Sequence, residues 1–249
     1  MKISLVYPKW TNQFGIFGKI GNNIGGVPPL NLCIIASLAE RIGHQVQIID
    51  AEIECLEEDK IIERLREFSP DLIGMTGKSS GFHRAITMAK KFKQHFDAGI
   101  MIGGPHMTRS KDEILADCFD YGFVDDAEIS FPEFLKAYET GSDLKEVKGI
   151  IFRDTSGEQV FTGLPEKIQD LDSLPYPSRH LLKMEKYKIG TLHGIKNFTT
   201  ILTVRGCPFD CIYCANTIYG RSVRYRSPES SVAEMEYCID TFGITHFEF

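Results

Sequence analysis

The feature that most constrains the fold is an alternation, from residue 2 to residue 138, of short apolar runs with longer amphipathic stretches. The runs are almost continuously apolar, which is typical of parallel strands buried on both faces. The longer stretches carry apolar residues at helical spacing, and the first of them stops at Gly43. Five such alternations predict a doubly wound, Rossmann-like α/β fold with a parallel sheet. The expected strands are Lys2–Tyr7, Gln45–Ile49, Asp71–Thr76, Ile100–Ile102 and Phe123–Val124, and the expected helices are Leu30–Ile42, Asp59–Phe68, His83–Phe96, Glu113–Phe119 and Phe131–Tyr138.

Composition and charge exclude several classes of protein. Of the 249 residues, 43% are hydrophobic and 25% are charged, close to the averages of globular proteins and unlike those of disordered chains. No apolar run approaches the length of a membrane span, and the short start before Pro8 does not have the pattern of a signal peptide. The formal net charge of −6 gives no basic surface for nucleic acid. We therefore expect a cytoplasmic protein without a membrane span and without a nucleic-acid partner.

Three loops at the carboxyl ends of the predicted strands are rich in glycine. Ligands of doubly wound sheets bind at this edge, and glycine lets the backbone approach a ligand closely. The alternative is that the glycines only form tight turns between strands and helices. Neither a GxGxxG opening of the first helix nor a P-loop occurs, which disfavours a dinucleotide or a triphosphate. The loops contain glycines 15, 18, 21, 25 and 26, the segment Gly77–Gly81 with Ser79 and Ser80, and the segment Gly103–Thr108.

The chain divides into three parts by its pattern. Residues 1–142 form the predicted α/β domain. Residues 143–197 contain a predicted hairpin, with strands Gly149–Phe152 and Gln159–Phe161, and then an Asp- and Pro-rich linker over Pro165–Arg179. Residues 198–249 begin a second domain with a β-branched strand, Phe198–Val204. A helix over Ser230–Phe242 and a strand from Ile244 follow.

The strand Phe198–Val204 leads directly into RGCPFDCIYCAN, which places Cys207, Cys211 and Cys214 within eight residues. Closed zinc sites take four protein ligands, and the remaining candidates are Cys238 and His246. A four-iron cluster is fully ligated by four cysteines, so three leave one iron open to a further ligand. The other cysteines, which are Cys33, Cys55, Cys118 and Cys238, stand singly among apolar residues and are expected to be small buried hydrophobes.

The C-x3-C-x2-C spacing, with Tyr213 just before the last cysteine and a strand just before the first, resembles the radical S-adenosylmethionine enzymes. The resemblance implies that Cys207, Cys211 and Cys214 bind a [4Fe-4S] cluster whose open iron binds S-adenosylmethionine. It also implies that Tyr213 lies beside the adenine of that cofactor. Reductive cleavage would give methionine and a 5′-deoxyadenosyl radical, with electrons from a donor such as flavodoxin or ferredoxin.

The first domain resembles the cobalamin-binding domain of the cobalamin-dependent members of that family. The resemblance rests on PPLNLCIIASLAERIGHQVQIIDA, SPDLIGMT and IMIGGPHMT, on the acidic Asp125-Asp126-Ala127-Glu128, and on GRSVRYRSPESSVAEM after the cysteines. It implies that Gly103, Gly104, Ser79 and Ser80 face the corrin ring or its nucleotide tail. Two features depart from the pattern. The DxHxxG motif is absent, and residues 125–128 stand where relatives often have GEGE.

Several polar residues near these motifs allow two interpretations. His83 and His106 lie on expected ligand-side loops and either contact cobalt or phosphate or are ordinary loop histidines. The arginines around the cysteines either hold a carboxylate of S-adenosylmethionine or form a solvated face. They are Arg205, Arg221, Arg224 and Arg226.

The resemblance implies a cobalamin-dependent radical S-adenosylmethionine enzyme acting on a small-molecule substrate. Methyl transfer to an unactivated carbon, or to phosphorus, is the expected reaction, and cyclisation and rearrangement are other reactions of this group. A different class remains open, namely a cobalamin carrier or sensor with a non-catalytic cluster loop. The implied second domain is a partial (βα)6 barrel, and the residues after Phe198 are too few for six units. We therefore expect the sequence to be the N-terminal fragment of a longer protein, inactive by itself.

Overall fold

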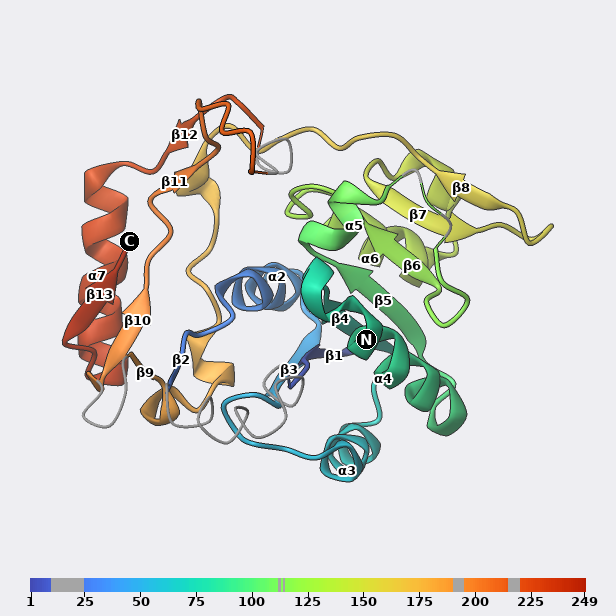
Figure 1. The fold of residues 1–249 in the computed structure, drawn as a ribbon, viewed down its shortest axis with the longest axis horizontal. Coiled ribbons are helices and arrows are strands. Elements are labelled where there is room, and N and C mark those ends of the chain that lie inside the picture. The colour runs from blue at the N-terminus through green and yellow to red at the C-terminus, as the bar shows by residue number, and fades with distance from the viewer. Residues whose placement is uncertain (10–24, 112, 114, 190–194, 215–219) are drawn as a thin grey trace.

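A seven-stranded mixed sheet in the order β3-β1-β4-β5-β6-β7-β8 forms the centre of the molecule (Figure 1). The computed structural model describes all residues except 10–24, 112, 114, 190–194 and 215–219. The strands of the sheet are β1 (Lys2–Tyr7), β3 (Gln45–Asp50), β4 (Leu72–Thr76), β5 (Gly99–Gly103), β6 (Tyr121–Phe123), β7 (Ile150–Arg153) and β8 (Gln159–Phe161). The helices around it are α2 (Leu30–Arg41), α3 (Glu58–Phe68), α4 (Phe82–His95), α5 (Pro105–Arg109) and α6 (Ser130–Thr140).

The first five strands of the sheet run parallel, as predicted. Leu5 of β1 pairs with Ile48 of β3 on one side and with Gly74 of β4 on the other. The pairs β4·β5 and β5·β6 are also parallel. β7 pairs antiparallel with β6, and β8 antiparallel with β7, so the hairpin predicted around residue 156 extends the sheet.

Helices cover both faces of the sheet, which confirms the doubly wound architecture. Along β1, Leu5 faces a core that contains residues of α2 and α6, and the next residue, Val6, faces a core that contains residues of α3 and α4. This alternation follows from the two-residue period of a strand. Because β1 also has a strand on each side, it is a central strand that is buried on both faces.

The prediction of a helix over residues 113–119 is wrong, because tertiary partners take the hydrogen bonds that a helix would make internally. The backbone N–H of Leu115 donates to Gln159 Oε1 at 2.6 Å, and its carbonyl accepts from Arg153 Nη2 at 2.5 Å. Both side chains belong to the β7–β8 hairpin. The helix of this region is instead the short α5, which begins at Pro105, a residue that suits the first helical position.

The C-terminal part forms a small βαβ unit, with β10 (Phe198–Thr200), α7 (Pro228–Phe242) and β13 (His246–Glu248). β10 and β13 pair in parallel, and Ile201, Cys238 and Ile244 are buried between these elements. The helix begins two residues earlier than predicted, because Ser227 Oγ caps it by accepting from the N–H of Ser230. Its end at Gly243, with φ of +65°, is as predicted.

The strand predicted over Phe198–Val204 is divided into β10 and the two-residue β11 (Val204–Arg205), because arginine side chains bind the carbonyls between them. Arg179 Nη2 donates to the carbonyl of Thr200 at 2.7 Å, and Arg226 Nη1 donates to that of Leu202 at 3.3 Å. β11 turns away and pairs antiparallel with β12 (Arg224–Tyr225). A further short pair joins β2 (Gly25–Gly26) to β9 (Lys188–Ile189).

All seven cysteines are free. Cys33, Cys118 and Cys238 are buried, as expected of small apolar residues. The same prediction for Cys55 is wrong: this residue is exposed in the turn after β3, where it adopts a φ of +53°.

Two buried polar contacts fasten the segment after β8 to the rest of the molecule. Arg179 is fully buried, and its guanidinium binds Glu234 Oε1 of α7 at 2.7 Å and Thr199 Oγ1 of β10 at 3.1 Å. Asp50, at the carboxyl end of β3, accepts a 2.7 Å hydrogen bond from the hydroxyl of Tyr187. Burial raises the pKa of Asp50 to about 6, against the opposing hydrogen bonds from Ile53, Tyr187 and Glu52.

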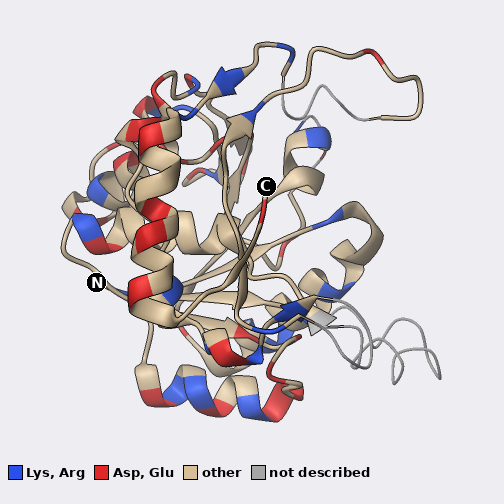
Figure 2. Cartoon of the chain, turned by 90° about the vertical axis from the view of Figure 1, so that its left-hand side faces the viewer, with Lys and Arg blue, Asp and Glu red and all other residues tan. Residues whose placement is uncertain are grey.

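Acidic side chains gather on α7, which carries Glu229, Glu234, Glu236 and Asp240 and no lysine or arginine, whereas α3 mixes charges of both signs (Figure 2). Four of the acidic residues that contribute to the formal net charge of −6 therefore lie on this one helix. Within the described part of the chain, no helix combines the length and the apolar composition needed to cross a membrane.

Replacing Arg179 by Met is expected to lower the free energy of unfolding by about 3–5 kcal/mol, because it leaves Glu234 buried with one arginine fewer. The matched control is Lys60→Met, which breaks an exposed pair with Glu63 and should leave stability unchanged. Urea unfolding followed by circular dichroism measures both. Equal stability of the two variants would contradict the role given to Arg179.

Asp50 is expected to make stability fall as the pH rises from 4 to 7. Its pKa is 3.8 in the unfolded chain and about 6 in the folded protein, so only the unfolded state ionises freely in this window. The contribution of this group is therefore fully present below pH 4 and is lost as the pH rises through 6, by about 3 kcal/mol. Asp50→Asn should lack this loss. Parallel stability curves for the two proteins between pH 4 and 7 would contradict the prediction.

Candidate functional site

A cavity of about 640 Å³ lies at the carboxyl ends of β1, β4 and β5. The chain passes from β1 to β3 on one side and from β3 back across to β4 on the other, so the strand order reverses at β1 and β4. Ligands of open α/β sheets bind at such a point. The wall is completed by the start of α2, by residues 125–128 after β6 and by residues 200–206 of the C-terminal part. Most of the lining side chains are apolar.

Gly103 and Gly104 both line the cavity, for different physical reasons. A Cβ on Gly103 would meet only ordinary contacts, the nearest being Phe123 Cβ at 3.6 Å. Gly104 has a φ of +98°, and a Cβ there would lie 2.7 Å from Thr76 Oγ1 and 3.1 Å from the carbonyl oxygen of Gly77. Gly104 is thus required by the packing of two strand ends, whereas Gly103 leaves the cavity wall open.

Ser79 and Ser80 lie in a 3-10 turn, η2 (Ser79–Gly81), and are exposed outside the lining of the cavity. His106 stacks on Phe82, with ring centroids 3.8 Å apart, and its Nδ1 lies 3.1 Å from Ser79 Oγ. Burial lowers the pKa of His106. Neither His106 nor His83 belongs to the lining residues, whereas Lys78 and Thr76 do. A ligand contact by the serines remains a prediction.

Residues 125–128, here called the acidic loop, follow β6 at the rim of the cavity. Asp125 adopts a φ of +64°, a conformation usual for glycine that Asp also tolerates, and its N–H donates to Thr108 Oγ1 at 2.8 Å. The chain therefore makes the left-handed turn here without a glycine. Asp125 Oδ2 lies 3.2 Å from Lys167 Nζ.

The acidic loop binds two arginines of the C-terminal part. Asp126 accepts from Arg224 Nη2 at 2.8 Å and lies 3.2 Å from Arg205 Nη1, while Glu128 Oε1 accepts from Arg205 Nη2. The side chains of Arg205 and Arg224 are 14% and 4% exposed. Burial by itself would lower the pKa of Arg205, but the hydrogen bond to Glu128 and the charges of Glu128 and Asp126 raise it. Arg205 and Arg224 therefore do not form a solvated face, and each is paired with a carboxylate of the acidic loop.

The remaining two arginines differ from each other. Arg226 is 7% exposed and pairs with Glu234 of α7, so it stabilises the βαβ unit. Arg221 is 72% exposed and pairs with Asp210, between the first two cysteines.

The cysteine loop, residues 207–214, continues directly from β11. Cys207 is half-buried and its N–H donates to the carbonyl of Gly220 at 3.1 Å, while Cys211 and Cys214 are exposed. Tyr213 is also exposed. Within the described residues, no three Cys, His, Asp or Glu side chains converge as a metal site would require. The three free thiols fit a cluster by their chemistry and spacing, and their role as ligands stays a prediction.

The structure keeps the other candidate zinc ligands apart from this loop. Cys238 is fully buried in the apolar core under α7. His246 lies on β13, and its Nδ1 is 2.9 Å from Thr245 Oγ1. Neither residue stands in the described structure as a fourth ligand beside the three thiols.

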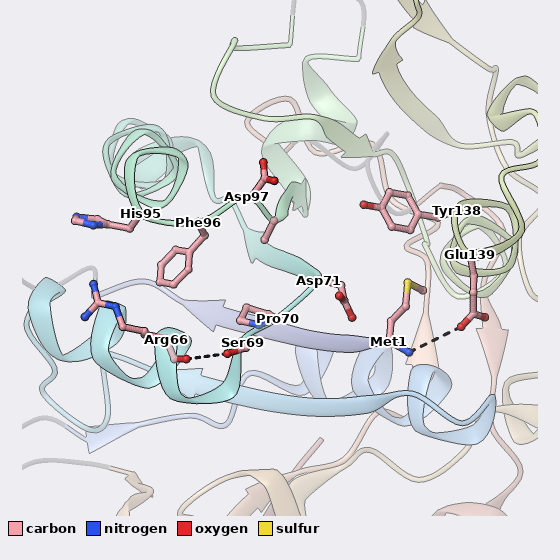
Figure 3. Close-up of a pocket in the computed structure, with 11 residues that line it drawn as sticks. Met1, Arg66, Ser69, Pro70, Asp71, His95, Phe96, Asp97, Tyr138 and Glu139 are labelled. Atoms are coloured by element: carbon pink, nitrogen blue, oxygen red, sulfur yellow. Dashed lines mark hydrogen bonds and ion pairs between the residues drawn. The ribbon is translucent and has the colours of Figure 1, made fainter.

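A second hollow, of about 630 Å³, lies at the opposite edge of the sheet, where the parallel strands begin (Figure 3). Arg66, Asp97 and Tyr138 are among its lining residues, and the amino group of Met1 lies 3.9 Å from Glu139 Oε1. The side chains come from separate helices and loops and do not converge on one point in the view. Because the ligand edge of such a sheet is the carboxyl edge, the first cavity is the candidate site.

Sequence reasoning missed Asp126, Glu128, Arg205 and Arg224 as members of one cluster. The information was present as an acidic run after β6 and as arginines on both sides of the cysteines. What it lacked was the pairing of β11 with β12, which joins the two arginines.

Three comparisons with known proteins agree with this description. Residues 20–135 match the B12 binding domain family. The chain is 32% identical to an uncharacterized methyltransferase of Pyrococcus horikoshii, over 100% of the chain and 53% of that protein. It is 30% identical to an anaerobic magnesium-protoporphyrin IX monomethyl ester cyclase of a Synechocystis strain, over 89% of the chain and 44% of that protein.

Among solved structures, the fold is similar to that of the cobalamin-dependent S-adenosylmethionine radical enzyme OxsB, which was solved with aqua-cobalamin and S-adenosylmethionine bound. The TM-score is 0.80 at 20% identity, over 99% of this chain and 33% of that one. The chain thus spans about half the length of the curated relatives it matches, or less. The comparisons thus give a B12 binding domain over residues 20–135 and, for the whole chain, a fold similar to that of OxsB.

Proposed function

We propose that the chain provides the cobalamin site and the cluster-binding loop of a radical S-adenosylmethionine methyltransferase. The observation that carries the proposal is that one cavity is walled both by the B12 binding domain and by residues 200–206, which lead directly into Cys207. A cobalamin in this cavity would lie next to the loop that holds the cluster. Such adjacency is what a reaction that uses both cofactors needs.

The cavity fits a corrinoid by its chemistry. A corrin is a broad, largely apolar disc with amide side chains at its rim. Gly103 supplies a flat stretch of wall, and Leu5, Met101 and Phe131 supply apolar contacts. Glu128 Oε2 and Arg224 Nε are buried on the wall without a hydrogen-bond partner among the described residues, and buried polar groups normally have one. They would accept from and donate to the amides of the ligand.

Cys207, Cys211 and Cys214 would hold a [4Fe-4S] cluster through three irons. When bound, the cluster supplies the electron that cleaves S-adenosylmethionine, and cobalamin supplies the methyl group for a small-molecule substrate. An external electron donor, such as flavodoxin or ferredoxin, would reduce the cluster. Tyr213, next to Cys214 and exposed, would cover the adenine, and the apolar side chains around the cavity would exclude water from the reacting groups.

The names of the relatives favour methyl transfer and leave ring closure as the second reaction, since one is called a methyltransferase and another a cyclase. A cobalamin carrier or sensor is the alternative from another class. In a carrier or sensor, the three cysteines of the loop would not be needed for any reaction. Formation of 5′-deoxyadenosine by the anaerobically reconstituted full-length protein with a reductant separates the two classes.

Gly103→Val is expected to weaken hydroxocobalamin binding at least about 10-fold, because the added methyl groups occupy the cavity wall while the fold has room for the first carbon. Ser142→Val, which adds bulk at an exposed position outside the lining of the cavity, is the control and should bind normally. The corrin absorbance that remains after desalting, and a titration, measure both. Wild-type protein that retains no corrin would contradict the proposed function.

In the full-length protein, replacing Cys207, Cys211 or Cys214 by Ala is expected to abolish both the iron and sulfide content after anaerobic reconstitution and the formation of 5′-deoxyadenosine. Cys55→Ala removes an exposed free thiol outside the loop and should change neither. Iron analysis, electron paramagnetic resonance of the reduced protein and product chromatography make the measurement. A Cys207→Ala protein that still forms 5′-deoxyadenosine would refute the assignment of the cluster ligands.

A further inference from the structure

The cysteine loop and the cavity share a wall, which consists of Val204, Arg205 and Gly206. Cys207 is the next residue, so the first proposed cluster ligand is covalently continuous with this wall. Gly206 has a φ of +95°, and a Cβ there would lie 2.1 Å from the carbonyl oxygen of Ser222. The wall is thus packed tightly against residues 222 and 223, and it is continuous in the chain with the cysteine loop.

The position of this wall depends on the acidic loop. Arg205 and Arg224 are direct partners across the antiparallel β11–β12 pair, and like charges at such positions repel each other. Asp126 lies between them, with one carboxylate oxygen toward each guanidinium, at 3.2 Å and 2.8 Å. The short ladder therefore forms against the acidic loop of the B12 binding domain and is destabilised away from it.

The group of ion pairs around the acidic loop contains as many acidic as basic side chains. Its acids are Asp125, Asp126 and Glu128, and its bases are Lys167, Arg205 and Arg224. Arg224 Nη1 also donates to the carbonyl of Ile168 at 2.7 Å, which ties the segment after β8 to the same point. Since Arg205 and Arg224 are nearly buried, removing one partner leaves an uncompensated charge rather than a solvated one.

We propose that these six residues form a clamp that couples the two cofactor sites, so that occupation of one raises the affinity of the other. Asp126 and Glu128 are cavity-lining residues of the B12 binding domain, and Arg205 belongs to the wall that continues into Cys207. A ligand that orders the acidic loop thereby orders Arg205 and the cysteine loop. By linkage, the effect is reciprocal. Arg205 acts here as a positioning residue, and the inference rests on the proposed function.

The test is a titration of hydroxocobalamin into anaerobic protein, before and after reconstitution with iron and sulfide. In the wild type, the reconstituted protein is expected to bind hydroxocobalamin about 10-fold more tightly, within the usual range of coupling between sites. In Arg205→Met and in Glu128→Gln, the ratio of the two dissociation constants should fall to about one. Arg205→Lys keeps the charge but not the two-carboxylate geometry, so it should restore part of the ratio.

Arg221→Met is the matched control, because it removes an arginine from the neighbouring part of the same hairpin whose pair with Asp210 is exposed. It should keep the wild-type ratio. Thermal unfolding identifies any variant that fails to fold. If Arg205→Met does not fold, Arg205→Lys is compared with the wild type, and an unchanged ratio in Arg205→Lys contradicts the clamp.

The outcomes separate the two proposals. Wild-type protein that binds hydroxocobalamin equally well with and without the cluster would contradict the clamp alone. So would an Arg205→Met protein that keeps the full ratio. Wild-type protein that binds no hydroxocobalamin in either state would contradict the proposed function itself.

Discussion

The carboxylate of Asp126 lies between two arginines that face each other across a two-residue ladder, and the relation of the two halves of the chain depends on this contact. Alone, β11 and β12 offer two backbone pairs and a repulsive pair of side chains. A hairpin of this kind is too short to be stable by itself. The acidic loop reverses the sign of the electrostatic energy, so the segment before the cysteines takes its structure from the domain it packs against.

The same arrangement recurs in the buried contacts of the segment after β8. Arg179 binds α7 and β10 together, and Tyr187 binds the end of β3. Each contact buries a charge or a hydroxyl that is stable only when its partner is present. Hydrogen bonds and ion pairs are directional, whereas apolar contacts are not. The buried polar contacts therefore set the orientation of the βαβ unit relative to the sheet.

The sequence was sufficient for the parallel sheet, since apolar runs such as Lys2–Tyr7 and glycine stops such as Gly43 report local preferences that the tertiary structure keeps. It failed where long-range partners replace local hydrogen bonds. The stretch 113–119 has helical spacing, yet Gln159 and Arg153 capture the backbone of Leu115. Phe198–Val204 has strand composition, yet Arg179 and Arg226 interrupt it. In both cases the competing hydrogen-bond partners lie more than twenty residues away in sequence and cannot be found from periodicity.

The candidate site, like the fold, could be predicted from the sequence only in part. Gly103 and Gly104 could be placed at the cavity from the topology rule alone, but only the structure distinguishes them. A carbon added to Gly104 would collide with Thr76, whereas Gly103 has room for one. A glycine pair at the end of a strand therefore combines a requirement of the fold with an open surface for a ligand. The same reasoning applies to Asp125, whose left-handed backbone replaces a glycine and leaves the acidic side chains of residues 126 and 128 to bind Arg205 and Arg224. Asp125 therefore keeps the turn that a glycine would make, and it adds a negative charge beside Lys167.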